Sequence, residues 1–366
     1  MRNCLIIFTL IFNYNVCAQD GFTSDLSKTL ELIYKADHEV SKKAVKNFYK
    51  NYPNHTARLL VRAYQMRWEH YPIFERDEAT YKLFIQVLDS AETSARKVLD
   101  EDKNNNENAY YYMTAHIMRA ELFALNDNMV KASLEGKNAF EYIKKGFEWC
   151  ETNPEFYTTT GLYNYYIEFY REKGFFYRSL LWPFSKGDKE KGLEYLKEAS
   201  KKATFTKVEA LYYLAHLNYK MEASPTNALP YANQLVKQYP SNPKFIDLKI
   251  EMLIADKQYS KAGEMLLNFN VADIPYLNAR KCLYQGILTL TSENNYRKAE
   301  TQIKVAIKMF EELLGDQDHY LSLAYMYLGT LENIANNASE ANDLLSKAKN
   351  YAKYPYIHRQ LEKLGA

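Results

Sequence analysis

Glycine and proline are scarce in this sequence, which has only 12 Gly and 10 Pro in 366 residues. An all-β fold needs many tight turns, and tight turns favour these two residues. Their scarcity argues against an all-β fold and favours helices. Hydrophobic residues make up 47% of the chain and charged residues 25%, which is typical of a globular protein. At this length the chain is either two domains or an array of repeats.

An excess of one charge is also missing, because the formal net charge is +2 and both signs are interspersed. This balance gives no electrostatic footprint for nucleic acid. Of the four cysteines, only Cys150 and Cys282 lie outside the first 18 residues. One possible bridge is not a disulfide framework, so we expect two separate buried thiols.

The motifs of several enzyme classes are absent as well. Seven histidines are scattered singly, and no pair has the spacing of metal ligands, so we expect no metal and no cofactor. The chain has no G-x-S-x-G elbow and no phosphate-binding G-x-x-x-x-G-K-[ST] loop. The sequence therefore predicts no enzyme activity, although two carboxylates that meet only in space stay open as a catalytic pair.

The first 18 residues are typical of a secretory signal peptide. Arg2 supplies the positive end, and residues 5–12 form an apolar core that is too short to span a bilayer. A cut after Ala18 removes this segment. The alternative is a lipoprotein acylated at Cys17, but the residues before Cys17 depart from that signal. We predict an exported protein, periplasmic or secreted, without a transmembrane segment; peripheral association with the envelope stays open.

Small residues recur with a period that indicates stacked helical hairpins. In each repeat a small residue, which we call the anchor, begins one face of a helix, and the same face continues four and seven residues after the anchor. The spacings between anchors are 36, 34, 37 and 42 residues, and the anchors are Gly192, Ala228, Ala262, Ala299 and Ala341. Gly161, Gly192 and Ala199 are small enough to let two helices approach closely.

The clearest unit pairs Leu328-Gly329 with Ala341, Leu345 and Ala348, and it resembles the tetratricopeptide repeat family. The resemblance extends from about Gly187 to the end and is weaker upstream. It implies an all-α, right-handed α-solenoid of stacked hairpins, whose first helices line a concave binding face. Glu332 and Asn218 depart from the Tyr of the family pattern, and Pro230 predicts a second helix that starts late or bends.

Three segments follow from this reading. Residues 1–18 are the signal peptide, residues 19–150 hold degenerate helical pairs, and residues 151–366 hold the clearer repeats in continuity with them. In the N-terminal part we expect helices near 24–50, 56–71, 79–101, 107–125 and 128–149.

Tyrosine is unusually common, at 33 residues, and many tyrosines fall on the expected first helices. Tyr combines a flat apolar face with a hydroxyl, so a Tyr-lined groove could hold a peptide, a partner helix or a sugar. The alternative is that these rings fill the space between helices. Carrying the family's concave positions onto this sequence selects ten residues: Glu155, Leu162, Tyr165, Glu209, Tyr212, His216, Tyr219, Lys281, Tyr284 and Leu288. The candidate partner-binding residues among them are Tyr165, Glu209, Tyr212, His216, Tyr219 and Tyr284.

Residues 174–187 interrupt the repeat with five aromatic residues in 14. If exposed, they form an apolar patch that marks an interaction surface; otherwise they fold back over neighbouring helices. The candidate residues of this insertion are Phe175, Phe176, Tyr177, Trp182 and Phe184.

The sequence thus predicts a non-catalytic scaffold that binds a protein or peptide on its concave face. The alternatives are a secreted α/α-toroid enzyme acting on carbohydrates, or a glycan-binding protein.

Overall fold

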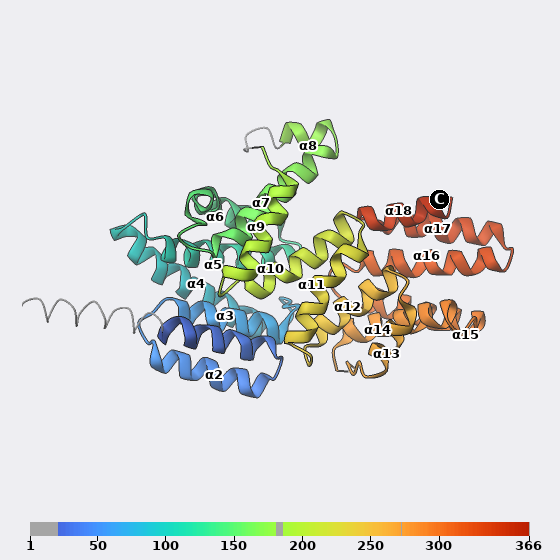
Figure 1. The fold of residues 1–366 in the computed structure, drawn as a ribbon, viewed down its shortest axis with the longest axis horizontal. Helices are drawn as coiled ribbons and strands as arrows, with labels where there is room; N and C mark the ends of the chain where they lie inside the picture. The colour runs from blue at the N-terminus through green and yellow to red at the C-terminus, as the bar shows by residue number, and fades with distance from the viewer. Residues whose placement is uncertain (1–20, 181–185, 272, 366) are drawn as a thin grey trace, which may run out of the picture. The chain divides into compact units, whose positions relative to one another are not determined.

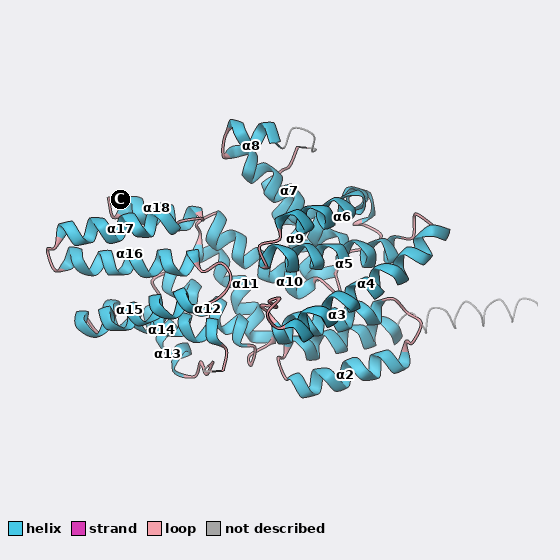
Figure 2. Cartoon of the chain, turned by 180° about the vertical axis from the view of Figure 1, so that it is seen from behind, coloured by secondary structure: helices cyan, strands magenta, loops and turns pink. Residues whose placement is uncertain are grey.

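The computed structural model describes residues 21–180, 186–271 and 273–365. Within these ranges the chain is helical and no residue lies in a strand (Figure 2). The predicted all-α class is confirmed. The predicted signal peptide, residues 1–18, lies outside the described residues.

The chain divides into two compact units, of which the first ends at Ala210 and the second begins at Leu211. The boundary falls within α10 (Lys207–His216). Residue 150, where we expect the degenerate pairs to pass into the clearer repeats, lies inside unit 1, between α6 (Met129–Trp149) and α7 (Phe156–Glu172). These two helices pack against each other, so the repeats before and after residue 150 share one core.

Unit 1 is a stack of helical pairs in which successive helices pack side by side (Figure 1). Its pairs are residues 21–34 with α2 (His38–Asn51), α3 (Ala57–His70) with α4 (Glu78–Glu101), α5 (Asn106–Leu125) with α6, and α7 with α9 (Lys189–Lys202). The short helix α8 (Phe175–Leu180) lies between α7 and α9 in the chain, where the insertion was expected.

Unit 2 repeats this arrangement, so each unit is a solenoid of stacked hairpins, as the repeat pattern predicts. Its first helix continues from α10 into a π-helical turn, η1 (Leu217–Met221), and pairs with α11 (Pro225–Gln238). The remaining elements are α12 (Pro243–Ala255), α13 (Tyr259–Leu267), α14 (Pro275–Thr291), α15 (Tyr296–Glu312), α16 (Asp318–Ile334), α17 (Ala338–Tyr351) and α18 (Pro355–Lys363).

One turn geometry recurs between the helices of a pair. A residue other than glycine takes a positive φ of 51–60° and ends the first helix, at Ala36, Asp127, Ala223, Lys257, Asn294 and Asn336. In several pairs the next residue, such as Asp37 or Asn128, caps the second helix with its side chain. This turn corrects the single helix predicted over 24–50, which is two helices separated at Ala36.

The predicted close approach of small residues is confirmed. A Cβ on Gly192 would lie 2.7 Å from the Gly161 carbonyl oxygen, so α7 and α9 meet backbone to backbone. A Cβ on Gly329 would likewise meet the Leu345 side chain at 2.8 Å, which matches the unit that carries the family resemblance. Pro230 lies inside α11, which begins at Pro225 and therefore does not start late.

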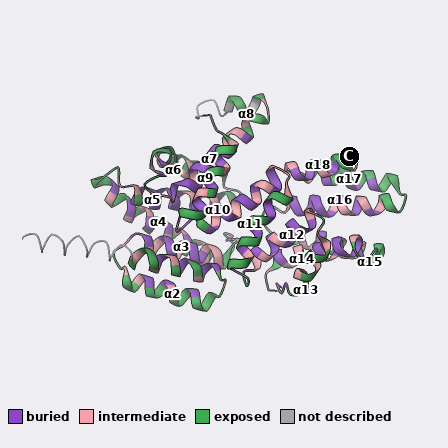
Figure 3. Cartoon of the chain, in the orientation of Figure 1, coloured by how far each residue is buried: buried purple, intermediate pink, exposed green. Residues whose placement is uncertain are grey.

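Burial follows from this packing: the core of each unit lies between the two helices of a pair and between successive pairs (Figure 3). Both expected thiols are free; Cys150 is buried and Cys282 is half-buried.

Candidate functional site

In unit 1 the expected concave residues lie inside the protein. Tyr165 is fully buried. The Glu209 side chain is 13% exposed and pairs with Arg67 at 2.5 Å, and it accepts a hydrogen bond from the Tyr64 hydroxyl at 3.2 Å. Burial raises the pKa of Glu209, although the Arg67 guanidinium opposes this shift. Arg67 also pairs with Glu121 at 3.0 Å, so Glu209 belongs to an ion-pair network.

The segment 203–209 fills the inner face of unit 1. The Phe205 ring lies 5.7 Å from the rings of both Tyr64 and Tyr110, and its carbonyl oxygen accepts a hydrogen bond from Tyr34. Glu155 fixes this segment by accepting the backbone N–H groups of residues 204, 205 and 206 at 2.6–3.0 Å. Burial raises the pKa of Glu155, against the effect of these hydrogen bonds. The inner face of unit 1 is therefore occupied by its own chain.

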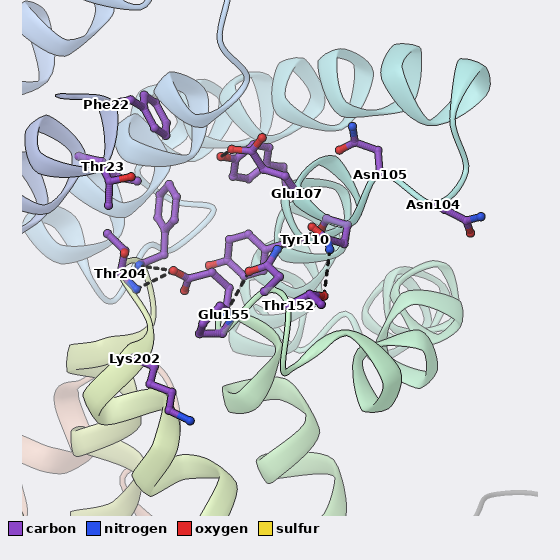
Figure 4. Close-up of a pocket in the computed structure, with 16 residues that line it drawn as sticks. Phe22, Thr23, Asn104, Asn105, Glu107, Tyr110, Thr152, Glu155, Lys202 and Thr204 are labelled. Carbon is purple, nitrogen blue, oxygen red and sulfur yellow. Dashed lines mark hydrogen bonds between the residues drawn. The ribbon is translucent and has the colours of Figure 1, made fainter. Parts of the chain in front are cut away.

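A pocket of about 600 Å³ opens beside this segment, at one end of the unit 1 hairpins (Figure 4). Its walls come from residues 104–107, 152–155 and 202–205, which connect successive hairpins, and from Phe22. Asn106 Nδ2 donates to Thr152 Oγ1 at 3.3 Å and Asn153 Nδ2 donates to the Asn106 carbonyl at 3.3 Å, so hydrogen bonds join two of the loops.

In unit 2 the structure brings together Tyr219, Tyr284 and His216 around two buried carboxylates. Glu251 accepts hydrogen bonds from His319 Nε2 at 2.6 Å and from the Tyr320 hydroxyl at 3.0 Å. Lys220 Nζ lies 3.8 Å from the Glu251 carboxylate.

The second carboxylate, Asp247, pairs with Arg280 Nη1 at 2.6 Å and accepts the Tyr284 hydroxyl at 3.0 Å. Arg280 in turn stacks over the Tyr320 ring, 4.0 Å from its centroid. We call Lys220, Asp247, Glu251, Arg280, His319 and Tyr320 the unit 2 charge cluster.

Burial controls protonation in the charge cluster. Together with the nearby Lys220 ammonium, it lowers the pKa of His319 to about 4 and that of His216 to about 3, so both rings are neutral at pH 7. Burial would raise the pKa of Glu251, but Lys220 and His319 outweigh it and the pKa lies below its ordinary value. Glu251 is thus an acceptor, and His319 must carry its proton on Nε2.

Helix α18 and the residue before it cover this cluster. The Tyr356 ring lies 4.6 Å from the Tyr219 ring, and the Tyr354 ring lies 5.5 Å from His319. Lys220 Nζ also lies 5.3 Å from the centroid of the Tyr354 ring, at cation–π distance. Tyr219 is 1% exposed beneath these residues, and a partner could contact it only after they had moved. Tyr284, on α14, is also 1% exposed and bonds to Asp247.

Tyr212 and His216 lie at the edge of the covered region. Both are half-buried, and their rings stack with centroids 6.3 Å apart. They are the members of the predicted unit 2 set that keep some accessible surface.

The insertion is described only in part. Helix α8 lies beyond the end of α7, clear of the other unit 1 helices in both views (Figures 1 and 2). Phe175 on α8 is 85% exposed. Phe176 and Tyr177 also lie on α8, and Trp182 and Phe184 lie outside the described residues. The use of these five residues as an interaction surface stays a prediction.

The sequence reading missed the carboxylates of the charge cluster, although a signal was present. Asp247 and Glu251 are four residues apart, hence on one face of α12, within the run FIDLKIEMLI. Two acids on one face of an otherwise apolar helix indicate buried, paired charges.

Within residues 21–180, 186–271 and 273–365, no helix is both long enough and apolar enough to cross a membrane. In the same ranges, no group of three or more His, Cys, Asp or Glu side chains is arranged to hold a metal ion.

No protein-family model matches the sequence, and no curated protein matches it. Among solved structures, the human IFIT1 dimer with m7Gppp-AAAA is 15% identical, covers 91% of this chain and 95% of its own, and has a TM-score of 0.37. Yeast Tom70 is 11% identical, covers 92% of this chain and 87% of its own, and also has a TM-score of 0.37. Likenesses this loose do not transfer a ligand to this chain.

Proposed function

We propose that this chain is a non-catalytic binding scaffold, and that unit 2 receives an aromatic segment of a partner protein on the face formed by its first helices. The observation that carries this proposal is the position of residues 354–361. Tyr354 and Tyr356 already lie on that face, against His216, Tyr219 and His319. The chain itself thus supplies an example of the kind of segment that fits.

Side-chain packing provides most of the hold on these residues. Helix α18 has 9 residues, and a helix this short is not stable in isolation. Its buried side chains are Tyr356, Ile357 and Leu361, each of which contributes about 1.5–3 kcal/mol. Arg359 Nη1 donates a hydrogen bond to the Glu222 carbonyl oxygen at 2.9 Å. A partner segment with similar aromatic residues could therefore replace it.

A binding experiment in two pieces tests the proposal. Protein comprising residues 19–351 is titrated into a fluorescent peptide of residues 352–366, with circular dichroism as the check that the protein is folded. We expect saturable binding that weakens at least tenfold when the peptide carries Tyr356→Ala, because that ring contacts Tyr219. Lys363→Ala, at an exposed position, is the matched control. Absence of binding by the folded protein would overturn the proposal.

The partner is expected to compete for the same face. Protein 19–351 should capture more of it from the exported fraction than the full chain does, and the peptide should displace it. If the peptide does not reduce the amount of partner captured, the partner binds at another surface of the protein.

The site of action follows from the signal-peptide prediction. We propose that the chain is exported and cut after Ala18, and that it acts in the periplasm or outside the cell. Mass spectrometry of the exported protein should give Gln19 as its first residue. An acylated Cys17 would contradict the cut and place the protein on a membrane as a lipoprotein.

A further inference from the structure

We propose that the pocket of unit 1 binds a neutral saccharide. This pocket lies apart from the charge cluster and is formed wholly within unit 1. Its volume of about 600 Å³ falls in the range of small-molecule sites. Its walls combine uncharged polar side chains from the connecting loops with an aromatic ring, Phe22, from residues 21–34.

The charged residues in the walls already have partners. The Glu155 carboxylate is saturated by three backbone N–H groups and the Thr206 hydroxyl. Glu107 accepts the Tyr111 hydroxyl at 2.6 Å, and Lys202 pairs with Glu198 at 2.8 Å. Figure 4 shows the Lys202 side chain directed away from the other labelled side chains. The one cation among the described residues of the walls, Lys202, is thus paired, and the two carboxylates repel anions, so these walls offer nothing to recruit an acidic ligand. A neutral ligand can use the uncharged polar groups instead.

The uncharged groups keep capacity for a ligand. Asn106 uses its Nδ2 for Thr152, and neither its side-chain oxygen Oδ1 nor the Thr204 hydroxyl has a partner among the described residues. The Asn104 side chain, exposed at the rim, also makes no hydrogen bond within the described ranges. An amide or hydroxyl that can both donate and accept suits sugar hydroxyls, which do the same.

An aromatic wall completes the chemistry. The Phe22 ring is half-buried and stacks on the His55 ring, with centroids 4.2 Å apart, which holds it in place. Tyr110 and Phe205, which are buried and whose rings lie 5.7 Å apart, also line the pocket. The C–H face of a pyranose ring packs against such a ring while its hydroxyls bond to the amides. The Phe22 ring and the Asn side chains together favour a sugar over a small polar solute, because the solute has no apolar face to pack on the aromatic ring.

The test uses the protein of residues 19–366 on an array of neutral and acidic glycans, followed by calorimetry with the best-bound neutral disaccharide. We expect neutral glycans to bind, with affinity lowered at least tenfold by Phe22→Ala and by Asn106→Ala. Thr204→Val replaces the hydroxyl with a methyl group of similar size and retains the backbone bond to Glu155, so it is expected to weaken binding without unfolding the protein. Asn342→Ala, at an exposed position of α17, should leave affinity unchanged.

Three results would overturn the inference: no neutral glycan bound, binding limited to acidic glycans, or equal affinity in the pocket variants and in Asn342→Ala. The protein of residues 19–351, which keeps the pocket but lacks α18, should bind the disaccharide as the full chain does. Loss of peptide binding with retained sugar binding would refute only the proposed function, and the reverse would refute only this inference.

Discussion

Units 1 and 2 cover their inner faces with their own chain, but they hold the covering segment by different means. In unit 1 the segment 203–209 is fixed through its backbone, because Glu155 accepts three of its N–H groups. In unit 2 helix α18 is held mainly by side-chain packing, with Tyr356 against Tyr219. Glu155 therefore fixes the backbone conformation of segment 203–209 in unit 1. In unit 2 the backbone of α18 makes its hydrogen bonds mainly within the helix itself, so the rest of the unit fixes it less firmly.

This difference assigns the two units different tasks. Moving segment 203–209 would leave buried N–H groups and a buried carboxylate without partners, which is costly. Unit 1 is therefore expected to keep its inner face closed and to bind ligands only in the adjacent pocket. Moving α18 exposes the aromatic side chain of Tyr219 and part of the charge cluster. A partner segment with similar aromatic side chains can then take the place of α18.

The largest effect is expected from Glu155→Ala. The substitution leaves three N–H groups without an acceptor, and those of Phe205 and Thr206 are buried. At about 1–3 kcal/mol for each buried group, unit 1 should lose at least about 2 kcal/mol of stability. Trp68, Trp149 and Trp182 all precede residue 211, so tryptophan fluorescence during urea unfolding reports on unit 1. Glu148→Ala, at an exposed position, is the control. A Glu155→Ala midpoint equal to that of the control would contradict the backbone anchor.

The second effect is the pH dependence of unit 2. The pKa of His319 is about 4 in the folded state and 6.5 for an unperturbed histidine. Between pH 6.5 and 4 the unfolded chain therefore binds a proton at this residue that the folded chain does not bind. Stability should fall by up to about 3 kcal/mol between pH 6.5 and 4. In His319→Gln this loss should shrink, as measured by denaturant unfolding followed by circular dichroism. An unchanged pH profile would argue against a buried neutral ring, and exposed His38→Gln gives the reference.

The smallest effects concern the helix contacts. Gly192→Ala forces its methyl group against a backbone oxygen 2.7 Å away and is expected to destabilise unit 1 by about 1–3 kcal/mol. In Gly286→Ala of unit 2, the new methyl group first contacts the Ile303 Cγ1 atom, and this side chain can move. We therefore expect a smaller loss of stability than for Gly192→Ala.

Gly136→Ala meets nothing within 4 Å and should stabilise its helix by up to about 1 kcal/mol. Thermal unfolding ranks the three variants. A neutral Gly192→Ala would mean that α7 and α9 can separate at little cost.

The sequence was sufficient to predict the helical pairs and the contact of Gly161 with Gly192, because both depend on spacings within a few turns of helix. The break at Ala36 was not predictable from composition, since a residue other than glycine takes the left-handed conformation there. The following Asp37, a good helix N-cap, was the available signal.

The closed inner faces could not be predicted from the repeat. Glu209, His216 and Tyr219 were correctly assigned to first helices, but their surroundings depend on contacts with distant parts of the chain. Glu209 pairs with Arg67, and residues 354–361 pack onto His216 and Tyr219. The pocket likewise combines loops about 50 residues apart in the chain. Contacts of this kind follow from tertiary packing, and no local pattern encodes them.

Hydrogen exchange on the intact protein tests most directly whether the inner face of unit 2 can be vacated. Amides that exchange through local opening do so at lower free energy than amides that require global unfolding. We expect the amides of residues 359–363 in α18 to exchange at least about 100-fold faster than those of Thr204, Phe205 and Thr206, which Glu155 binds. If the α18 amides exchange as slowly as these three, helix α18 does not open, and the face it covers is not a binding site.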